Sequence, residues 1–198
     1  METVSLAIIS SLQIKENTDK ILPLLSAEEK TRAQRFVCEK DMLLSLGGAF
    51  LCRRRYGTNA VITRTPGGKP RVNGSFFSVS HSEDLIAAAF CDNLEVGVDL
   101  EKVRDGFEEI TEYCFTEEEQ ASQNDLFELF TSKESLAKAS GTGLVPSPIS
   151  FPALPVEGPV SFRGKTYYRH TLPLDGYRLS VCLENSDFKI EKEICNEF

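Results

Sequence analysis

Two carboxylates separated by one leucine, Asp99 and Glu101, are the residues whose types and spacing most directly suggest chemistry. They end a short apolar segment that begins at Val96. Side chains alternate between the faces of a strand, so both carboxylates point to the same side. One or two carboxylates, completed by waters and phosphate oxygens, are a usual ligand set for Mg²⁺. The pair therefore predicts a Mg²⁺ site, although an exposed strand end with two solvated acids has the same pattern.

Two other segments carry polar side chains with two readings each. His81 lies between Ser80 and Ser82 near the predicted turn of a hairpin, where it is either a hydrogen-bonded structural residue or a phosphate contact. Glu134 and Lys138 are four residues apart on a predicted helix and so neighbour each other on one face. Taken alone, they indicate only a surface salt bridge of at most ~0.5 kcal/mol.

The elements that must position these residues alternate between helix and strand. Ser26 and Glu29 have capping-box spacing and predict a helix start. The helix over 126–140 has an apolar side, with Lys133, Glu134 and Lys138 expected on the other side and Gly141 as its stop. The remaining predictions are a buried first strand over 4–10, helices over 40–56 and 107–113, a hairpin from 76–80 and 85–90, and C-terminal strands within 160–191.

Charge is divided unevenly along the 198 residues. Residues 30–71 hold ten Lys and Arg against two acids, whereas residues 83–128 hold fifteen Asp and Glu against two basic residues. The basic half suits an anion and the acidic half a metal ion, but two solvated faces explain the same split. The net charge of −8 argues against nucleic acid as a partner.

The six cysteines contain no CxxC pair, which argues against a zinc or thioredoxin-like centre and favours reduced thiols. The N-terminal segment lacks a basic region, and its apolar run is too short for a signal peptide or a membrane span. We therefore expect a cytoplasmic protein without a membrane partner.

Four motifs occur in an informative order: Gly-Lys-Pro at 68–70, Ser-Val-Ser-His-Ser at 78–82, Val-Gly-Val-Asp-Leu-Glu at 96–101, and Phe-Thr-Ser-Lys-Glu-Ser-Leu-Ala-Lys at 130–138. From the Arg35-Phe36 region to Gly143, the chain resembles the Sfp-type 4′-phosphopantetheinyl transferases. The resemblance implies an α+β (α/β) fold of two similar α/β halves related by a pseudo-two-fold axis, here 1–93 and 94–198. It also implies coenzyme A in the cleft between the halves.

The resemblance further implies transfer of the phosphopantetheine arm of coenzyme A to a serine of an apo acyl or peptidyl carrier protein, with release of 3′,5′-ADP. Two fused halves make a monomer the expected state. Asp99, Glu101 and Glu134 would be the Mg²⁺ carboxylates, with Glu134 and Lys138 as the catalytic base and the leaving-group lysine. The implied coenzyme A contacts are Lys69, Pro70, Ser80, His81, Ser45 and, on the early helices, Lys30 or Arg32.

Glu119 is either a further acid near the metal, as the resemblance implies, or only the capping-box partner of Thr116. Phe130, Ser78 and Thr142 depart from the Trp, Asn and Lys that are frequent in the family. Two other functions stay open: a non-catalytic coenzyme A or carrier-binding module of the same fold, and a different metal-dependent phosphotransferase.

Overall fold

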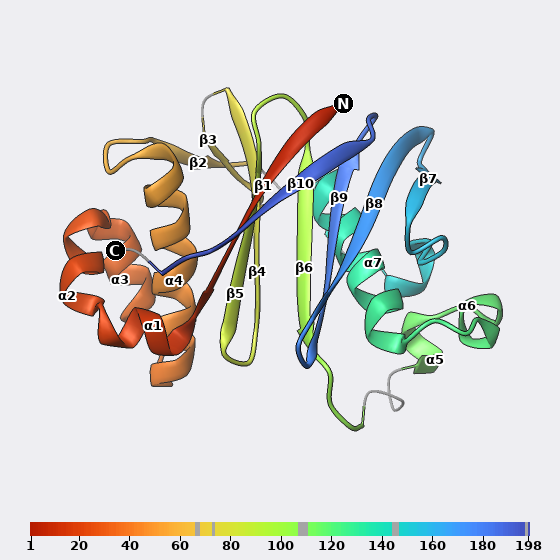
Figure 1. Ribbon diagram of the computed structural model, residues 1–198, viewed down its shortest axis with the longest axis horizontal. Coiled ribbons are helices and arrows are strands. Elements are labelled where there is room, and N and C mark those ends of the chain that lie inside the picture. Colours follow the sequence, from red (N-terminus) through yellow and green to blue (C-terminus); the bar gives the residue numbers. More distant parts are fainter. Residues whose placement is uncertain (66–67, 73, 107–110, 144–146, 197) are drawn as a thin grey trace.

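A computed structural model describes residues 1–65, 68–72, 74–106, 111–143, 147–196 and 198. Two sheets pack face to face, with helices covering the outer side of each (Figure 1). The strands are β1 (Glu2–Ser10), β2 (Ile62–Arg64), β3 (Pro70–Val72), β4 (Ser75–Ser82), β5 (Leu85–Cys91), β6 (Val96–Lys102), β7 (Gly158–Phe162), β8 (Lys165–Leu174), β9 (Tyr177–Glu184) and β10 (Phe188–Ile194). The helices are α1 (Ser11–Glu16), α2 (Thr18–Ile21), α3 (Ala27–Ala33), α4 (Glu39–Tyr56), α5 (Thr111–Cys114), α6 (Glu117–Ala121) and α7 (Leu126–Ser140), with 3₁₀ turns at Leu22–Leu24 and Pro148–Ser150.

The two sheets share one connectivity. The first sheet has the order β10-β1-β5-β4-β3-β2 and the second β6-β9-β8-β7. In each, the opening strand pairs antiparallel with the last strand of a meander, β1 with β5 and β6 with β9. The last strand, β10, returns to the first sheet and pairs parallel with β1. The α+β fold class is thus confirmed, while the two-fold axis and the division at residue 93 stay predictions.

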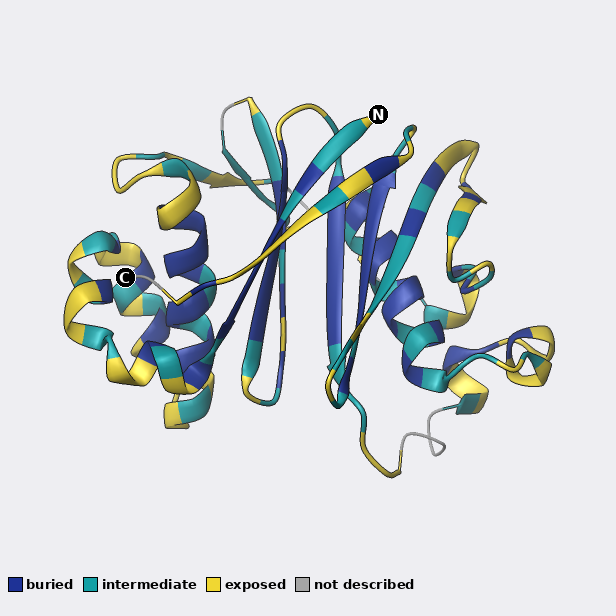
Figure 2. Ribbon diagram, in the orientation of Figure 1, coloured by how far each residue is buried: buried dark blue, intermediate teal, exposed yellow. Residues whose placement is uncertain are grey.

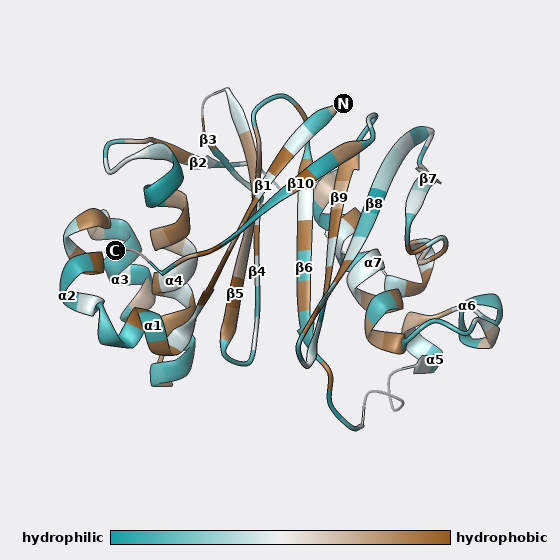
Figure 3. Ribbon diagram, in the orientation of Figure 1, coloured by the Kyte–Doolittle hydropathy of each residue, from teal (hydrophilic) through white to brown (hydrophobic). Residues whose placement is uncertain are grey.

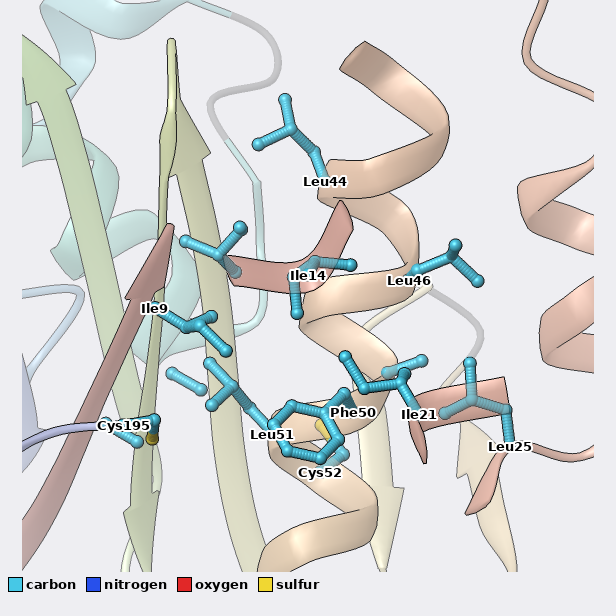
Figure 4. Close-up of a cluster of buried hydrophobic side chains, with 14 of the residues drawn as sticks. Ile9, Ile14, Ile21, Leu25, Leu44, Leu46, Phe50, Leu51, Cys52 and Cys195 are labelled. Carbon is cyan, nitrogen blue, oxygen red and sulfur yellow. The ribbon is translucent and has the colours of Figure 1, made fainter. Parts of the chain in front are cut away.

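Side chains that alternate along the strands of the first sheet belong to two separate hydrophobic cores, one on each face of the sheet. On β1, Leu6 and Ile8 join the core between the sheets, whereas Ala7 and Ile9 face the helices. Figure 4 shows Ile9 with Ile14 and Phe50 in the helical core. The inner strands are buried over most of their length, while β10 is exposed at most positions (Figure 2). This layering leaves β6 covered by the first sheet on one face and by α7 on the other.

Strand β6 divides its residues between these two faces. Val96, Val98 and Leu100 join the core between the sheets. Gly97 faces α7, because an added Cβ would lie 2.0 Å from the Ser135 carbonyl oxygen. Asp99 and Glu101 share that side by the period of two. The hydrophobic colour along β6 gives way to a hydrophilic end (Figure 3). Asp99 is buried and Glu101 is half-buried, so the two carboxylates lie at the border of the core.

Most predicted elements are confirmed: the structure has β1 over Glu2–Ser10, α4 over Glu39–Tyr56 and α7 over Leu126–Ser140. The short helix α1, capped by Ser10 and Gln13, was not predicted. Of the helix predicted over 107–113, the described residues show α5 from Thr111, and 107–110 lie outside the described residues.

The prediction that Lys133 lies on the exposed side of α7 is wrong. Its side chain is 0% exposed, and its ammonium lies 2.7 Å from Glu119 Oε2 and donates to the Phe151 carbonyl at 2.6 Å. Burial of a cation is tolerated here because a carboxylate and a carbonyl replace its water.

Candidate active site

The centre of the candidate site is Asp99, which two side chains hold from different elements. Ser80 of β4 donates its hydroxyl hydrogen to Asp99 Oδ1 at 2.8 Å, and Lys138 of α7 donates to the same oxygen at 2.7 Å. Lys138 also donates to Ser80 Oγ at 3.0 Å. Strands β4 and β6 are close neighbours although they belong to different sheets. The site therefore joins both sheets and α7 at one carboxylate.

Glu101 and Glu134 face the same negative charge. Burial, then the charge of Asp99, raises the pKa of Glu134 to about 7. The same two causes raise the pKa of Glu101, whose Oε2 accepts from Ser82 at 2.9 Å. Carboxylates raise each other's pKa only when they are close in a partly dry environment. The charge of Asp99 thus acts on both of the other predicted metal ligands.

The donor set fits a hard cation. Asp99 is 3% exposed, and its Oδ2 is a buried oxygen without a hydrogen-bond partner. An unpaired buried carboxylate oxygen is costly, and a cation removes that cost together with the repulsion among the three acids. Among the described residues, no group of three His, Cys, Asp or Glu side chains is already arranged to hold a metal ion. Mg²⁺ takes only one or two carboxylates in many phosphate sites, so Asp99 with either glutamate meets its needs.

A cavity of ≈ 770 Å³ lies next to this cluster. Of the residues predicted to bind coenzyme A or act in catalysis, it is lined by Arg32, Ser45, Lys69, Pro70, His81 and Lys138. Ser80, which donates to Asp99, is not part of this lining, and neither are Lys30 and the predicted catalytic residue Glu134. Arg53 and Arg64, which the sequence reasoning did not assign to the site, line it as well. The only sequence signal for these two arginines is that both lie in the basic stretch 30–71.

Not every cation at the cavity is available to a ligand. The Lys69 ammonium donates to Glu95 Oε2 at 2.7 Å and to the carbonyls of Val96 and Ala139. Arg53 is held by Glu29, with its Nε 2.9 Å from Glu29 Oε2. Partial desolvation of the His81 ring at the cavity, then the Lys138 charge, lowers the pKa of His81. Among the described residues that line the cavity, Arg32 and Arg64 form no salt bridge, and both supply positive charge to the cavity; Arg64 donates to the Gly68 carbonyl.

Glu119 has the structural role that its capping-box spacing predicted. It closes the box with Thr116, pairs with Lys133 and accepts from the Ala153 amide at 2.7 Å. These three contacts occupy its carboxylate, and none of them involves Asp99, Glu101 or Glu134. Glu119 is therefore a structural anchor for α6 and the segment around Ala153.

The raised pKa of Glu134 predicts a pH dependence of stability. The folded protein keeps a proton that the unfolded chain releases between the ordinary pKa of 4.5 and about 7. Its free energy of unfolding therefore falls as pH rises through that window. Urea denaturation of the metal-free protein at about pH 5 and about pH 8 should show a smaller loss for Glu134→Gln than for wild type. An equal loss in both proteins would remove Glu134 as the cause.

A buried, unpaired carboxylate oxygen beside a cation-lined cavity is an arrangement typical of enzymes that act on phosphate-containing substrates. Residues 95–182 match the model of the 4′-phosphopantetheinyl transferase superfamily. This matched segment contains Asp99, Glu101, Glu134 and Lys138.

Curated relatives extend the match over most of the chain. The 4′-phosphopantetheinyl transferase ffp of Bacillus subtilis is 31% identical over 199 residues, which cover 88% of each protein. A second 4′-phosphopantetheinyl transferase of Bacillus subtilis is 29% identical over 86% of this chain and 87% of its own length. The 4′-phosphopantetheinyl transferase gsp of Aneurinibacillus migulanus is 33% identical over 61% of this chain and 57% of its own. The chain belongs to the 4′-phosphopantetheinyl transferase superfamily. Among the described helices, none has the length and apolar character to cross a membrane.

Proposed function

We propose that this protein transfers the 4′-phosphopantetheine arm of coenzyme A to a serine hydroxyl of an apo acyl or peptidyl carrier protein, in a Mg²⁺-dependent reaction that releases 3′,5′-ADP. The observation that carries the proposal is the buried, unpaired Oδ2 of Asp99 beside Lys138 and the cavity. A simple coenzyme A-binding module has no need for an uncompensated carboxylate at this place. Family membership supports coenzyme A and a carrier protein as the two substrates.

In the proposed mechanism, the serine oxygen attacks the phosphorus that bears the pantetheine arm, and the bond from that phosphorus to 3′,5′-ADP breaks. Asp99, with Glu101 or Glu134, would hold Mg²⁺, and the bound ion would supply positive charge to the pyrophosphate. Lys138 lines the cavity and is the cation that reaches the leaving phosphate oxygen. Such electrostatic stabilisation of the leaving group is usually the largest contribution to phosphoryl transfer.

Glu134 is the proposed acceptor of the serine proton. A general base works best when its pKa is near the working pH, and that of Glu134 is about 7. Arg32, Ser45 and His81 line the part of the cavity that would take the nucleotide. The six cysteines are free, which supports a reducing compartment such as the cytoplasm. Because both sheets belong to one chain and share one connectivity, we propose that the protein acts as a monomer.

The test is the mass of the carrier. Purified protein with coenzyme A, Mg²⁺ and a panel of apo carriers from fatty-acid, polyketide and nonribosomal-peptide synthesis should raise at least one carrier by the mass of one phosphopantetheine arm. A matched reaction with EDTA should leave that carrier unmodified. Several diverse carriers that stay unmodified contradict the proposal, and calorimetric titration that favours ATP over coenzyme A would point to another phosphotransferase.

A further inference from the structure

Two serines of β4 repeat the same hydrogen-bonding arrangement against β6. Ser80 Oγ accepts from the Leu100 amide at 3.3 Å and donates to the carboxylate of the preceding residue, Asp99, at 2.8 Å. Two residues further on, Ser82 Oγ accepts from the Lys102 amide at 3.0 Å and donates to the preceding Glu101 at 2.9 Å. Both serines are at least nine-tenths buried. Each hydroxyl thus ties one carboxylate to the backbone of its own strand.

The need of the Leu100 and Lys102 amides for acceptors explains why a hydroxyl lies opposite each of them, but it does not explain where the hydroxyl hydrogens point. In its own sheet, β6 is an edge strand that pairs with β9 alone, so its amides on the other side need acceptors. A serine hydroxyl meets that need whichever way its hydrogen points. In both cases the hydrogen is directed to a predicted metal ligand, which fixes the rotamer of that carboxylate. Orientation of ligands by surrounding hydrogen bonds is what tunes metal affinity in proteins.

Ser80 has no capacity left for a substrate. Its hydroxyl donates once, to Asp99, and accepts twice, from the Leu100 amide and from Lys138. One donor and two acceptor positions are all that a hydroxyl offers. It is also 6% exposed and absent from the lining of the cavity, to which its neighbour His81 contributes. These observations separate Ser80 from the coenzyme A contact that the sequence predicted.

We propose that Ser80 and Ser82 are positioning residues that orient Asp99 and Glu101 for the divalent cation, rather than contacts to coenzyme A. The inference rests on the proposed function, because it assumes that these carboxylates bind the cation. Its distinctive consequence is a loss of cation affinity without a loss of coenzyme A affinity. A substrate contact would produce the opposite pattern.

The experiment uses Ser80→Ala and Ser82→Ala, each with a threonine variant that restores the hydroxyl in a strand-compatible side chain. Ser180→Ala is the matched control. Ser180 is a fully buried serine of β9 that pairs with Asp99 in the sheet register, but its hydroxyl contacts Ser135. Removal of Ser180 Oγ leaves Ser135 its bond to the Ser132 carbonyl. The control thus removes a buried hydroxyl from the neighbouring strand without touching a carboxylate of β6.

Two measurements decide the outcome: Mn²⁺ binding followed by electron paramagnetic resonance, and the KM for coenzyme A at saturating Mg²⁺. Each alanine variant should bind Mn²⁺ about 10-fold more weakly, with an unchanged KM, while its threonine counterpart and Ser180→Ala bind as wild type does. A raised KM with unchanged Mn²⁺ binding, or no change in either, overturns the proposal. Should Ser80→Ala fail to fold, Ser82→Ala at the strand end decides alone. If the wild-type protein binds no Mn²⁺, the proposed metal-dependent function is wrong as well. If the wild type binds Mn²⁺ and the alanine variants bind it equally well, only the positioning role is wrong.

Discussion

Asp99→Asn should lower the rate of carrier modification at least about 10³-fold while the protein stays folded. The substitution keeps the shape of the side chain and removes its negative charge. In the wild type, Asp99 is 3% exposed. Its Oδ1 accepts a hydrogen bond from Lys138 at 2.7 Å, and its Oδ2 has no partner. The amide oxygen of asparagine can still contact a hard cation, but it lacks the negative charge that makes a carboxylate a strong ligand. Both the cation and the placement of Lys138 should therefore be lost together.

Asp92→Asn is the matched control for this prediction. Asp92 is an exposed acid of the same charge, and its carboxylate contacts Arg55 rather than the site. The measurement is the initial rate of carrier mass increase at saturating coenzyme A and Mg²⁺, with thermal unfolding to verify the fold. Asp92→Asn should keep the wild-type rate. If Asp99→Asn stays within about 10-fold of wild type, Asp99 does not hold the catalytic cation.

The sequence allowed the placement of Asp99 and Glu101 to be predicted because it depends on a local rule. Alternation along β6 puts both acids on the face opposite to Val98 and Leu100, and the structure has this arrangement. The bounds of α7 were also local, since Asp125 caps one end and Gly141 stops the other. Positions within one element can be read from its own residues.

Contacts between elements could not be predicted in the same way. Lys133 follows the helical period of a polar face, yet the segment at Pro148–Phe151 covers it and provides carbonyl acceptors. Lys69 was expected to meet coenzyme A, and nothing in its own loop indicates that Glu95, Val96 and Ala139 converge on its ammonium. The polarity of a side chain does not reveal whether water or distant backbone satisfies it.

The partners of the two carboxylates show the same limit. Ser80 and Ser82 have the spacing of one strand face, which was visible in the sequence. Their role depends on the approach of β4 to β6 across two different sheets, and this approach has no local signal. A resemblance by motif can place such residues near a site without showing which neighbour they contact.

Gly97→Ala should destabilise the protein by about 3 kcal/mol or more, because α7 lies directly on the strand at this residue. An added Cβ would be 2.0 Å from the Ser135 carbonyl oxygen and 2.5 Å from the Ala139 amide nitrogen. Both atoms belong to the backbone of α7, so no side chain can rotate away to make room. The helix itself must move away from β6, and the buried contacts of Leu136 and Ala139 would be loosened with it.

Gly48→Ala is the matched control for the Gly97 prediction, since it adds the same methyl group at a half-buried glycine of α4. Its Cβ would meet only the Cγ1 atom of Val79 at 3.2 Å, the end of a side chain that can shift slightly, and alanine favours the helix α4. Urea denaturation should therefore show a large loss for Gly97→Ala and a change within about 1 kcal/mol for Gly48→Ala. Since α7 carries Glu134 and Lys138, the Gly97 variant should also transfer the arm about 10²-fold more slowly at temperatures where it is still folded. If Gly97→Ala is as stable as the wild type, the close approach of α7 to β6 does not contribute to stability. The explanation that this approach brings Lys138 of α7 to Asp99 would then be wrong.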